Sequence, residues 1–380
     1  MVGCRSRICP DSDMANEADI AEDLQDAVLG ALRAGESLRI CGSGSKGFLL
    51  SSSNGAETSA GSRLLSVHEH AGILDYHPEE LVITARAGTR LADIEQVLAR
   101  HHQRLPFEPP RIKGGGTLGG AVACGLSGPG RPWSGSVRDA VLGVEMLNGL
   151  GERLTFGGQV MKNVAGYDVS RLQVGAFGTL GVLLSVSVRV LPMPPVESTV
   201  VQDVGPAEAL KRCRVWSRSA YPISATAYLD GLLRVRLSGA EAAVAEAASA
   251  LGGELRDERI FWRQLRDHDL DFLRQEQPIW RCVLPPAAPE PLQDCLVMWG
   301  GGLRWWPTSR DASEVLQTVG QQQGTAEIFG DGFVRGHLAG LGSTQAGDHW
   351  RVQRQVQTRV REAFDPHGLF NPELTRRHAD

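Results

Sequence analysis

The first periodic apolar pattern of the chain lies between residues 20 and 32. Apolar residues recur there at the three-to-four-residue spacing of an amphipathic helix, and Gly35 predicts where that helix ends. Leu38–Cys41 then has the pattern of a short strand that leads into the glycine-rich segment Gly42–Gly47. Residues 1–13 show no periodicity, so we expect an extension without folded structure and the onset of the fold at Met14.

Short apolar runs and one more helix follow as far as a proline cluster. Leu81–Arg86 reads as a strand, and Thr89 is the predicted N-cap of the helix after it. A glycine-dense run at 114–130 reads as loop. Further strands are predicted at 141–147, 153–156 and 182–190. The prolines within 192–195 mark the best domain boundary.

The pattern changes beyond these prolines. A strand at 232–237 precedes an Ala/Glu-rich helix at 240–250, and another helix is predicted at about 346–363. The stretch 278–307 is rich in Trp, Pro and Gly. Because strands and helices occur in both parts, the chain is predicted to have an α+β fold with two domains, which fits its 380 residues.

Charge and cysteine content exclude several classes of protein. The formal net charge of −5 argues against a nucleic-acid or anionic-membrane surface built on bulk charge. The seven cysteines include no CxxC, so neither a disulfide framework nor an iron–sulfur or zinc site is expected within this chain. No secretory h-region and no apolar stretch of membrane-spanning length is present. These features favour a cytoplasmic protein with reduced thiols.

The segment Gly42–Gly47 matches GxGxxG after a predicted strand, but it lacks the context of a dinucleotide fingerprint. That fingerprint requires a helix to begin at the last glycine, whereas Phe48–Gly55 reads as strand or loop. A Walker A phosphate-binding loop is excluded as well, because the segment contains no GK[ST]. Small residues can still expose backbone N–H groups to a diphosphate, with Lys46 adding one charge. The alternative is a tight surface turn.

Two further glycine-rich segments change this picture. Gly114–Ala123 is almost free of side chains, and Gly175–Gly181 forms a third such run. Segments like these pack poorly alone, and close approach of a ligand to the backbone gives a reason for them. Together the three segments predict one long, embedded cofactor. Three unrelated flexible loops are the alternative.

Five motifs occur in a fixed order: Ile40–Gly47, Thr117–Gly125, Trp133–Gly143, Lys162–Asp168 and Gly178–Val182. As a set they resemble the PCMH-type FAD-binding domain of the vanillyl-alcohol-oxidase superfamily, in its D-2-hydroxy-acid dehydrogenase branch. The phrases RPWSGSVRD, FGGQVMKNVAGYD and FDPHGLFNP are similar to the GlcE-type family of FAD-binding glycolate oxidase subunits. The resemblance extends from about Met14 to Leu374.

The resemblance implies a domain plan and a set of FAD contacts. A PCMH-type FAD domain would occupy 14–195, a smaller α+β domain 196–364, and a tail at 365–380 would return to the FAD domain. The implied FAD contacts are Gly42, Ser43, Gly44, Ser45, Lys46 and Gly47 as the pyrophosphate loop, Thr117, Gly119 and Gly120 as the second loop, and Lys162, Asn163, Gly166 and Val182. Covalent members of the superfamily often carry a His where Ser45 stands, so non-covalent FAD is expected.

The catalytic residues are not identified by the sequence. Dehydrogenases of this branch often carry a metal-associated HxGDGNxH-like segment, and its nearest match, Glu327–Phe333, lacks the flanking histidines. No metal site is therefore predicted. Arg281 and Arg304 are candidates for holding a substrate carboxylate, because a guanidinium suits a bidentate contact. A structural Arg–Trp contact is the alternative, and the tryptophans of 280–306 are favoured as a core over an interface.

The resemblance implies a subunit of a complex that oxidises glycolate to glyoxylate. Electrons would pass through the flavin to an iron–sulfur partner, and a second flavoprotein subunit would be the catalytic one. Contact with the inner face of the membrane would come only through these partners, and no nucleic acid is expected. Two alternatives stay open: a self-sufficient FAD-linked D-2-hydroxy-acid dehydrogenase, and a non-catalytic scaffold that contains flavin.

Overall fold

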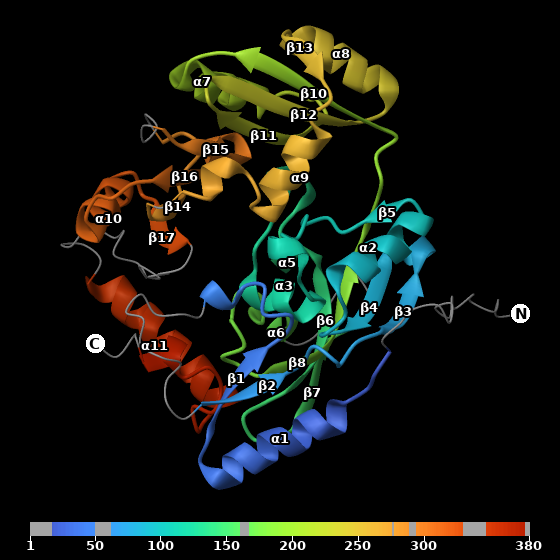
Figure 1. The fold of residues 1–380 in the computed structure, drawn as a ribbon, viewed down its shortest axis with the longest axis vertical. Helices are drawn as coiled ribbons and strands as arrows, with labels where there is room; N and C mark the ends of the chain where they lie inside the picture. The colour runs from blue at the N-terminus through green and yellow to red at the C-terminus, as the bar shows by residue number, and fades with distance from the viewer. Residues whose placement is uncertain are drawn as a thin grey trace, which may run out of the picture.

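The computed structural model describes residues 17–49, 62–159, 167–275, 277–288, 294–329 and 347–376. The predicted extension at 1–13 and the segment 330–333 lie outside the described residues. Figure 1 shows two lobes stacked along the long axis, each built around its own sheet, with helix α9 (Arg259–Asp267) between them.

The first lobe contains a five-stranded antiparallel sheet in the order β3-β4-β8-β6-β7. Its strands are β3 (Ile73–His77), β4 (Val82–Arg86), β6 (Val141–Leu147), β7 (Arg153–Gly157) and β8 (Val182–Arg189). The predicted strands in this region are therefore confirmed. Strand β8 is buried along nearly its whole length, because side chains from its two faces enter two different hydrophobic clusters. This sheet forms one side of the site described below.

A small parallel sheet of β1 (Ser37–Cys41) and β2 (Ser62–Ser66) lies beside helix α1 (Ala21–Ala34). The helix confirms the first periodic pattern, and it ends at Gly35 in the left-handed conformation, φ 66°. The C-terminal segment returns to this sheet. Leu38 N donates to Leu369 O at 2.7 Å, and Asn371 N donates to Leu38 O at 2.9 Å. Residues more than 300 positions apart thus fix the start of the glycine-rich segment.

Two predictions about helices of the first lobe are wrong. Helix α2 (Leu91–Arg100) has Arg90, not Thr89, at its N-cap position. The Thr89 hydroxyl is used elsewhere, since it accepts from Gly72 N at 2.9 Å and donates to Gly72 O at 3.0 Å. The glycine-dense run is not all loop, because Leu118–Cys124 forms helix α3 with Thr117 as N-cap.

The second lobe contains an eight-stranded sheet in the order β13-β10-β12-β11-β15-β16-β14-β17. Its strands are β10 (Val196–Asp203), β11 (Ile223–Leu229), β12 (Leu232–Gly239), β13 (Glu254–Arg256), β14 (Ile279–Val283), β15 (Leu296–Met298), β16 (Leu303–Pro307) and β17 (Thr325–Phe329). Helices α7 (Pro206–Trp216), α8 (Glu241–Leu251) and α10 (Ala312–Gln321) accompany it. The tryptophans at 280, 299, 305 and 306 are all buried, which confirms a core.

The remaining elements are short, apart from one long helix. They are η1 (Gly47–Leu49), η2 (Pro78–Glu80), β5 (Gln103–Arg104), η3 (Ile112–Gly114), α4 (Arg131–Ser134), α5 (Val137–Ala140), α6 (Val169–Leu172), β9 (Leu191–Pro192), η4 (Asp271–Leu273), η5 (Trp299–Gly301), α11 (Gly347–Phe364) and α12 (Glu373–Arg376). The long helix α11 confirms the prediction at 346–363. None of the helices in the described ranges is long and apolar enough to cross a membrane.

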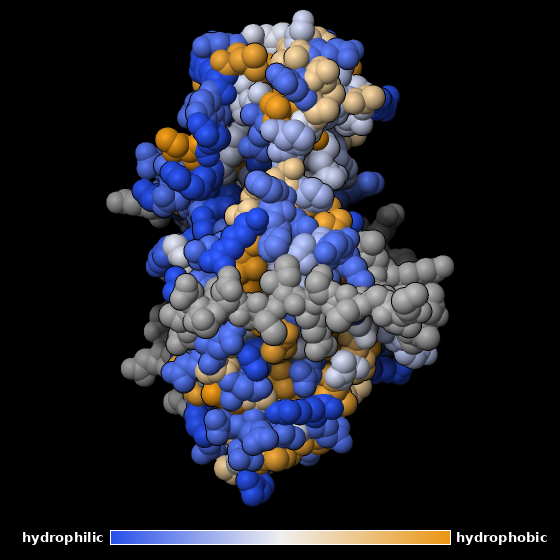
Figure 2. All heavy atoms as spheres, turned by 90° about the vertical axis from the view of Figure 1, so that its right-hand side faces the viewer, coloured by the Kyte–Doolittle hydropathy of each residue, from blue (hydrophilic) through white to orange (hydrophobic). Residues whose placement is uncertain are grey.

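The surface seen in Figure 2 is mainly hydrophilic, with apolar residues in small separate areas. Scattered apolar residues are normal on a protein surface and do not mark a binding site. The largest group of glycine-rich segments lies instead in the interior of the first lobe.

Candidate cofactor site

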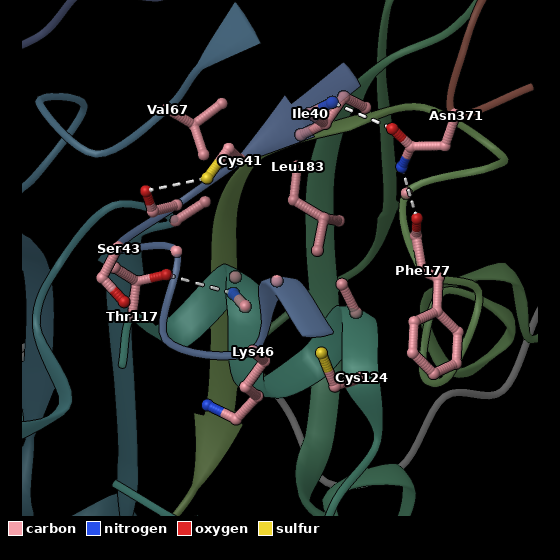
Figure 3. Close-up of a pocket in the computed structure, with 18 of the residues that line it drawn as sticks. Ile40, Cys41, Ser43, Lys46, Val67, Thr117, Cys124, Phe177, Leu183 and Asn371 are labelled. Atoms are coloured by element: carbon pink, nitrogen blue, oxygen red, sulfur yellow. Dashed lines mark hydrogen bonds between the residues drawn. The ribbon is translucent and has the colours of Figure 1, made fainter. Parts of the chain in front are cut away.

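A cavity lies in the first lobe where three glycine-containing segments meet (Figure 3). It is lined by Ile40–Gly47 from the β1 end, by residues between Thr117 and Cys124 on helix α3, and by Phe177, Gly178, Gly181 and Leu183 around the start of β8. Val67, Ala87, Gln173 and Asn371 complete the lining. The three segments predicted to surround one cofactor therefore do meet around one cavity.

The first segment presents unused backbone donors to this cavity. In the part of the chain that the structure describes, the N–H groups of Ser43, Gly44, Ser45 and Lys46 have no hydrogen-bond acceptor. Gly44 has φ 72°, which turns the segment back on itself. Gly47 N closes the turn onto Gly44 O at 2.9 Å. Successive unpaired N–H groups in a turn are a known form of anion site.

Lys46 adds a buried positive charge to the same segment. The residue is 8% exposed, and no carboxylate of the described residues forms an ion pair with it. Burial lowers the pKa of the Lys46 ammonium below its ordinary value, and the neighbouring Cys124 and Asp267 oppose that shift. A Cβ on Gly116 would lie 3.5 Å from Lys46 Nζ. Because a buried charge needs a partner, this cavity favours an anionic ligand.

The second segment uses its glycines for packing. A Cβ on Gly119 would lie 2.7 Å from the Ala87 Cβ, so glycine allows α3 to approach the end of β4. The first N–H groups of α3 are already bonded: Leu118 N to Thr89 O, Gly119 N to Ala87 O at 2.8 Å, and Gly120 N to Thr117 Oγ1 at 3.2 Å. Thr117, Gly119 and Gly120 line the cavity, but the N–H groups of Gly119 and Gly120 are not available to a ligand.

The third segment and the C-terminus close the cavity. Asn371 accepts from Ile40 N at 2.9 Å and donates to Phe177 O at 2.6 Å, as Figure 3 shows. Val182 does not line the cavity, since its side chain is fully buried in the cluster around α1, whereas its neighbours Gly181 and Leu183 do line it. Of the other predicted contacts, Lys162, Asn163 and Gly166 lie outside the described residues.

Gln173 is a lining residue that sequence reasoning missed. It is 2% exposed, and its Nε2 has no hydrogen-bond partner among the residues described. Nothing in the local sequence distinguishes this glutamine, because it becomes part of the site only when the segment after α6 packs beside α3. An unpartnered buried amide, a buried ammonium and four free N–H groups around one cavity fit a polar, anionic cofactor.

The two candidate arginines of the second lobe differ in their positions. Arg304 is fully buried in the sheet, where one guanidinium nitrogen donates to Ala288 O at 3.3 Å, and the structure does not bring it to the cavity. Arg281 lies on β14 and donates to Glu327 Oε1 at 2.8 Å. Among the described residues no group of three or more His, Cys, Asp or Glu side chains is placed to hold a metal ion.

The family and its relatives agree with this geometry. The FAD binding domain family matches residues 15–157, which contain the first two glycine-rich segments. In solved structures, an alkyldihydroxyacetonephosphate synthase has a similar fold, with a TM-score of 0.63 and 12% identity over 94% of this chain and 76% of that one. The fold and the site define an FAD-binding protein with the two-domain α+β architecture of the vanillyl-alcohol-oxidase type, and FAD is its cofactor.

The sequence comparison identifies the family more closely. The chain is 41% identical to glycolate oxidase subunit GlcE of Escherichia coli (strain K12), over 94% of this chain and 98% of the relative. It belongs to the GlcE family. Glycolate oxidase subunit GlcD of Bacillus subtilis (strain 168) is 32% identical over 38% of this chain and 30% of its own length. D-lactate dehydrogenase of Anaerostipes hadrus is 30% identical over 42% of this chain and 32% of its own length.

Proposed function

We propose that this protein is the FAD-binding subunit of a glycolate oxidase complex, which oxidises glycolate to glyoxylate and passes electrons to an iron–sulfur partner subunit. The observation that carries the proposal is the 41% identity to E. coli GlcE over almost the whole of both chains. The partial similarity to GlcD supports a second, catalytic flavoprotein subunit as a partner. The site would act in the cytoplasm, with any membrane contact made through the partners.

The proposed FAD contacts divide into groups with different tasks. The N–H groups of Ser43–Lys46 and the Lys46 ammonium would hold the diphosphate. Gly42, Gly47, Thr117, Gly119 and Gly120 would shape the wall, and Gly181 and Leu183 would bring the backbone around Val182 to the cofactor. Lys162, Asn163 and Gly166 would complete the set. Bound there, FAD would supply an electron-accepting flavin, which the residues of this chain would orient and shield from water.

We propose that FAD is bound without a covalent link. Ser45 has no ring nitrogen to attack the flavin. The Cys124 thiol lines the cavity at the C-terminal end of α3, so it is the group whose reaction with the flavin must be tested. Acid precipitation of the purified protein should release the yellow cofactor into the supernatant. Flavin that stays with the pellet after denaturing washes would contradict this proposal.

Reconstitution tests the function itself. The FAD-loaded chain alone is mixed with glycolate without oxygen, and we expect the oxidised flavin spectrum to persist because no base is identified in this chain. Adding the catalytic and iron–sulfur subunits should restore dye reduction by glycolate. Disrupting FAD binding in this subunit should then lower the rate. Rapid bleaching of the isolated chain would favour the self-sufficient dehydrogenase, and an unaffected rate with an FAD-free subunit would favour the scaffold.

A further inference from the structure

Two arginines from different lobes converge on one tryptophan. The Arg131 guanidinium, on helix α4 of the first lobe, lies 4.7 Å from the centre of the Trp299 ring, and the Arg281 guanidinium, on β14, lies 5.7 Å from it. Trp299 belongs to the second lobe, but its Nε1 donates to Gly128 O of the first lobe at 3.0 Å. The three side chains therefore form a cluster across the boundary between the lobes.

The backbone at Trp299 is held in a conformation that this residue type rarely adopts. Trp299 has φ 56°, and Gly300 and Gly301 follow with φ 65° and 105°. Gly300 N is fixed by Thr226 Oγ1 at 2.8 Å. Strain of this kind costs about 1–3 kcal/mol, and it concentrates at binding and active sites. The ring that receives both guanidinium groups is thus fixed at an energetic cost.

The two guanidinium groups of this cluster differ in their partners. Arg281 has one carboxylate partner, Glu327, at 2.8 Å. Arg131 forms no ion pair with any carboxylate in the described ranges, and its contact is the ring of Trp299. Burial lowers the pKa of the Arg131 guanidinium, and the positive charge of Arg281 lowers it further. The charge of Asp139 opposes these shifts without forming an ion pair with Arg131. The guanidinium donors of Arg131 have no hydrogen-bond acceptor among the described residues, so they can bind an anion.

Strand β17 and His268 link the cluster to the Lys46 end of the cofactor cavity. Phe329, two positions after Glu327 on β17, contacts Phe48, two positions after Lys46, with ring centres 5.2 Å apart. His268 packs against Trp305 and Phe329 in the same layer. Burial, together with the charges of Arg281 and Lys46, lowers the pKa of His268 to about 3, so this side chain adds no positive charge. Strand β17, which carries the Glu327 partner of Arg281, therefore contacts the residue that follows the cavity-lining segment 40–47.

We propose that Arg131 and Arg281 together bind the carboxylate of the small 2-hydroxy acid, one guanidinium from each lobe. This inference rests on the proposed function, because it names the substrate contact of that same site. It replaces Arg304 by Arg131 as the second cationic partner. Glu327 competes with the ligand for Arg281, and Trp299 holds both guanidinium groups in place.

Calorimetric titration of the FAD-loaded chain with oxalate tests the site without turnover. Oxalate offers a planar carboxylate and has no carbinol carbon to oxidise. Arg131→Ala and Arg281→Ala should each weaken binding by about 10- to 100-fold, the range for a lost charge-assisted hydrogen bond. Arg281→Lys, which retains a cation for Glu327, should weaken binding less than Arg281→Ala. Arg138→Ala, which removes an exposed arginine on the neighbouring helix α5, is the matched control and should bind as the unaltered chain does.

Glu327→Gln separates a carboxylate site from a purely structural clamp. Removing the competing carboxylate should tighten oxalate binding by about five-fold, whereas a structural Arg–Trp contact predicts no gain. Equal affinities of all variants, or no binding by the unaltered FAD-loaded chain, overturn the site. The proposed function is judged separately, by FAD content and by reconstituted glycolate oxidation. If oxalate does not bind, the carboxylate site is wrong and the proposed function is unaffected. If the purified chain holds no FAD, the proposed function is wrong.

Discussion

The two glycine-rich segments of the cofactor cavity have similar compositions and opposite tasks. Gly42–Gly47 is a turn whose N–H groups from Ser43 to Lys46 have no acceptor among the residues described. In helix α3, which begins at Leu118, the first N–H groups are bonded and glycine permits close packing on Ala87. The first segment is built to contact a ligand, and the second to place a helix. Changes in the first should alter affinity, and changes in the second should alter stability.

The largest effect is expected from Gly119→Val in the second segment. A Cβ at this position would lie 2.7 Å from Ala87 Cβ and 3.0 Å from Ala87 O, which is backbone and cannot move aside alone. Overpacking of this kind costs about 1–3 kcal/mol or more, so the chain should lose both thermal stability and FAD. Differential scanning calorimetry of the FAD-free protein measures the first loss. A variant with the melting temperature of the unaltered chain would show that α3 does not depend on this contact.

Lys46→Met should produce opposite changes in affinity and stability. The FAD dissociation constant should rise by about 10- to 100-fold, because a charge-assisted contact to phosphate is lost. The FAD-free chain should become more stable, because a buried ammonium without an ion pair is replaced by an apolar side chain of similar length. Fluorescence titration with FAD and urea unfolding measure the two changes. A less stable FAD-free variant would mean that Lys46 supports the fold.

The same lysine predicts a pH dependence of the FAD-free chain. Burial lowers the pKa of Lys46 in the folded chain below 10.5, its ordinary value. Between the two pKa values, the unfolded chain therefore binds the proton more tightly than the folded chain does. The free energy of unfolding should therefore rise as the pH increases towards 10.5, and the cost of the charge is fully present at lower pH. The difference between unaltered chain and Lys46→Met should shrink over this range. A difference that is independent of pH would contradict the lowered pKa.

Local sequence patterns predicted most helices and strands, and the errors arose where contacts between residues far apart in the sequence determine the structure. The helix at 20–32 and the strands β4, β6, β7 and β8 follow from the apolar pattern, because each buries one face or both against its neighbours. Strand β3 of the same sheet was not predicted. Helix α3 was missed because five glycines in 114–120 disfavour a helix locally. Its close fit against Ala87 and its Thr117 cap offset that preference. The wrong N-cap at Thr89 has the same origin, since its hydroxyl bonds Gly72.

The candidate site shows the same division. The segment at 42–47 was recognisable because it follows a strand and carries a lysine among small residues. Gln173 carries no local signal, and it lines the cavity only through the packing of the segment after α6. Arg131 also carries none, and the packing of α4 brings it to Trp299. Arg304 has the same local pattern as Arg281, a guanidinium among tryptophans. Side chains alternate between the two faces along a strand, and the pairing of β14 with β16 places Arg281 and Arg304 on opposite faces of the sheet.

Gly44→Val should reduce FAD affinity with little effect on the FAD-free fold. Gly44 has φ 72°, and a branched side chain there costs about 1–2 kcal/mol relative to glycine. A turn without a ligand relieves that strain by changing shape, whereas a turn that must hold a diphosphate does not. We expect the FAD dissociation constant to rise by about 5- to 30-fold. Gly231→Val is the matched control, because Gly231 has φ 76° and no atom within 4 Å of the added Cβ, and it lies between β11 and β12, outside the cavity lining.

The smallest effect tests whether the two segments are coupled. A Cβ on Gly42 would lie 2.6 Å from Thr117 Oγ1, the atom that caps α3 by accepting from Gly120 N. Gly42→Ala should therefore disturb the cap, and Thr117→Ala alone should cost about 1 kcal/mol. In the double variant the Thr117 hydroxyl is absent, so Gly42→Ala has nothing to clash with and no cap to disturb. The loss of stability of the double variant should therefore be about 1 kcal/mol smaller than the sum of the two single losses. Urea unfolding of the four FAD-free proteins measures this coupling. Strictly additive losses would show that the ligand-contacting turn and the helix-placing segment act independently, although they line one cavity.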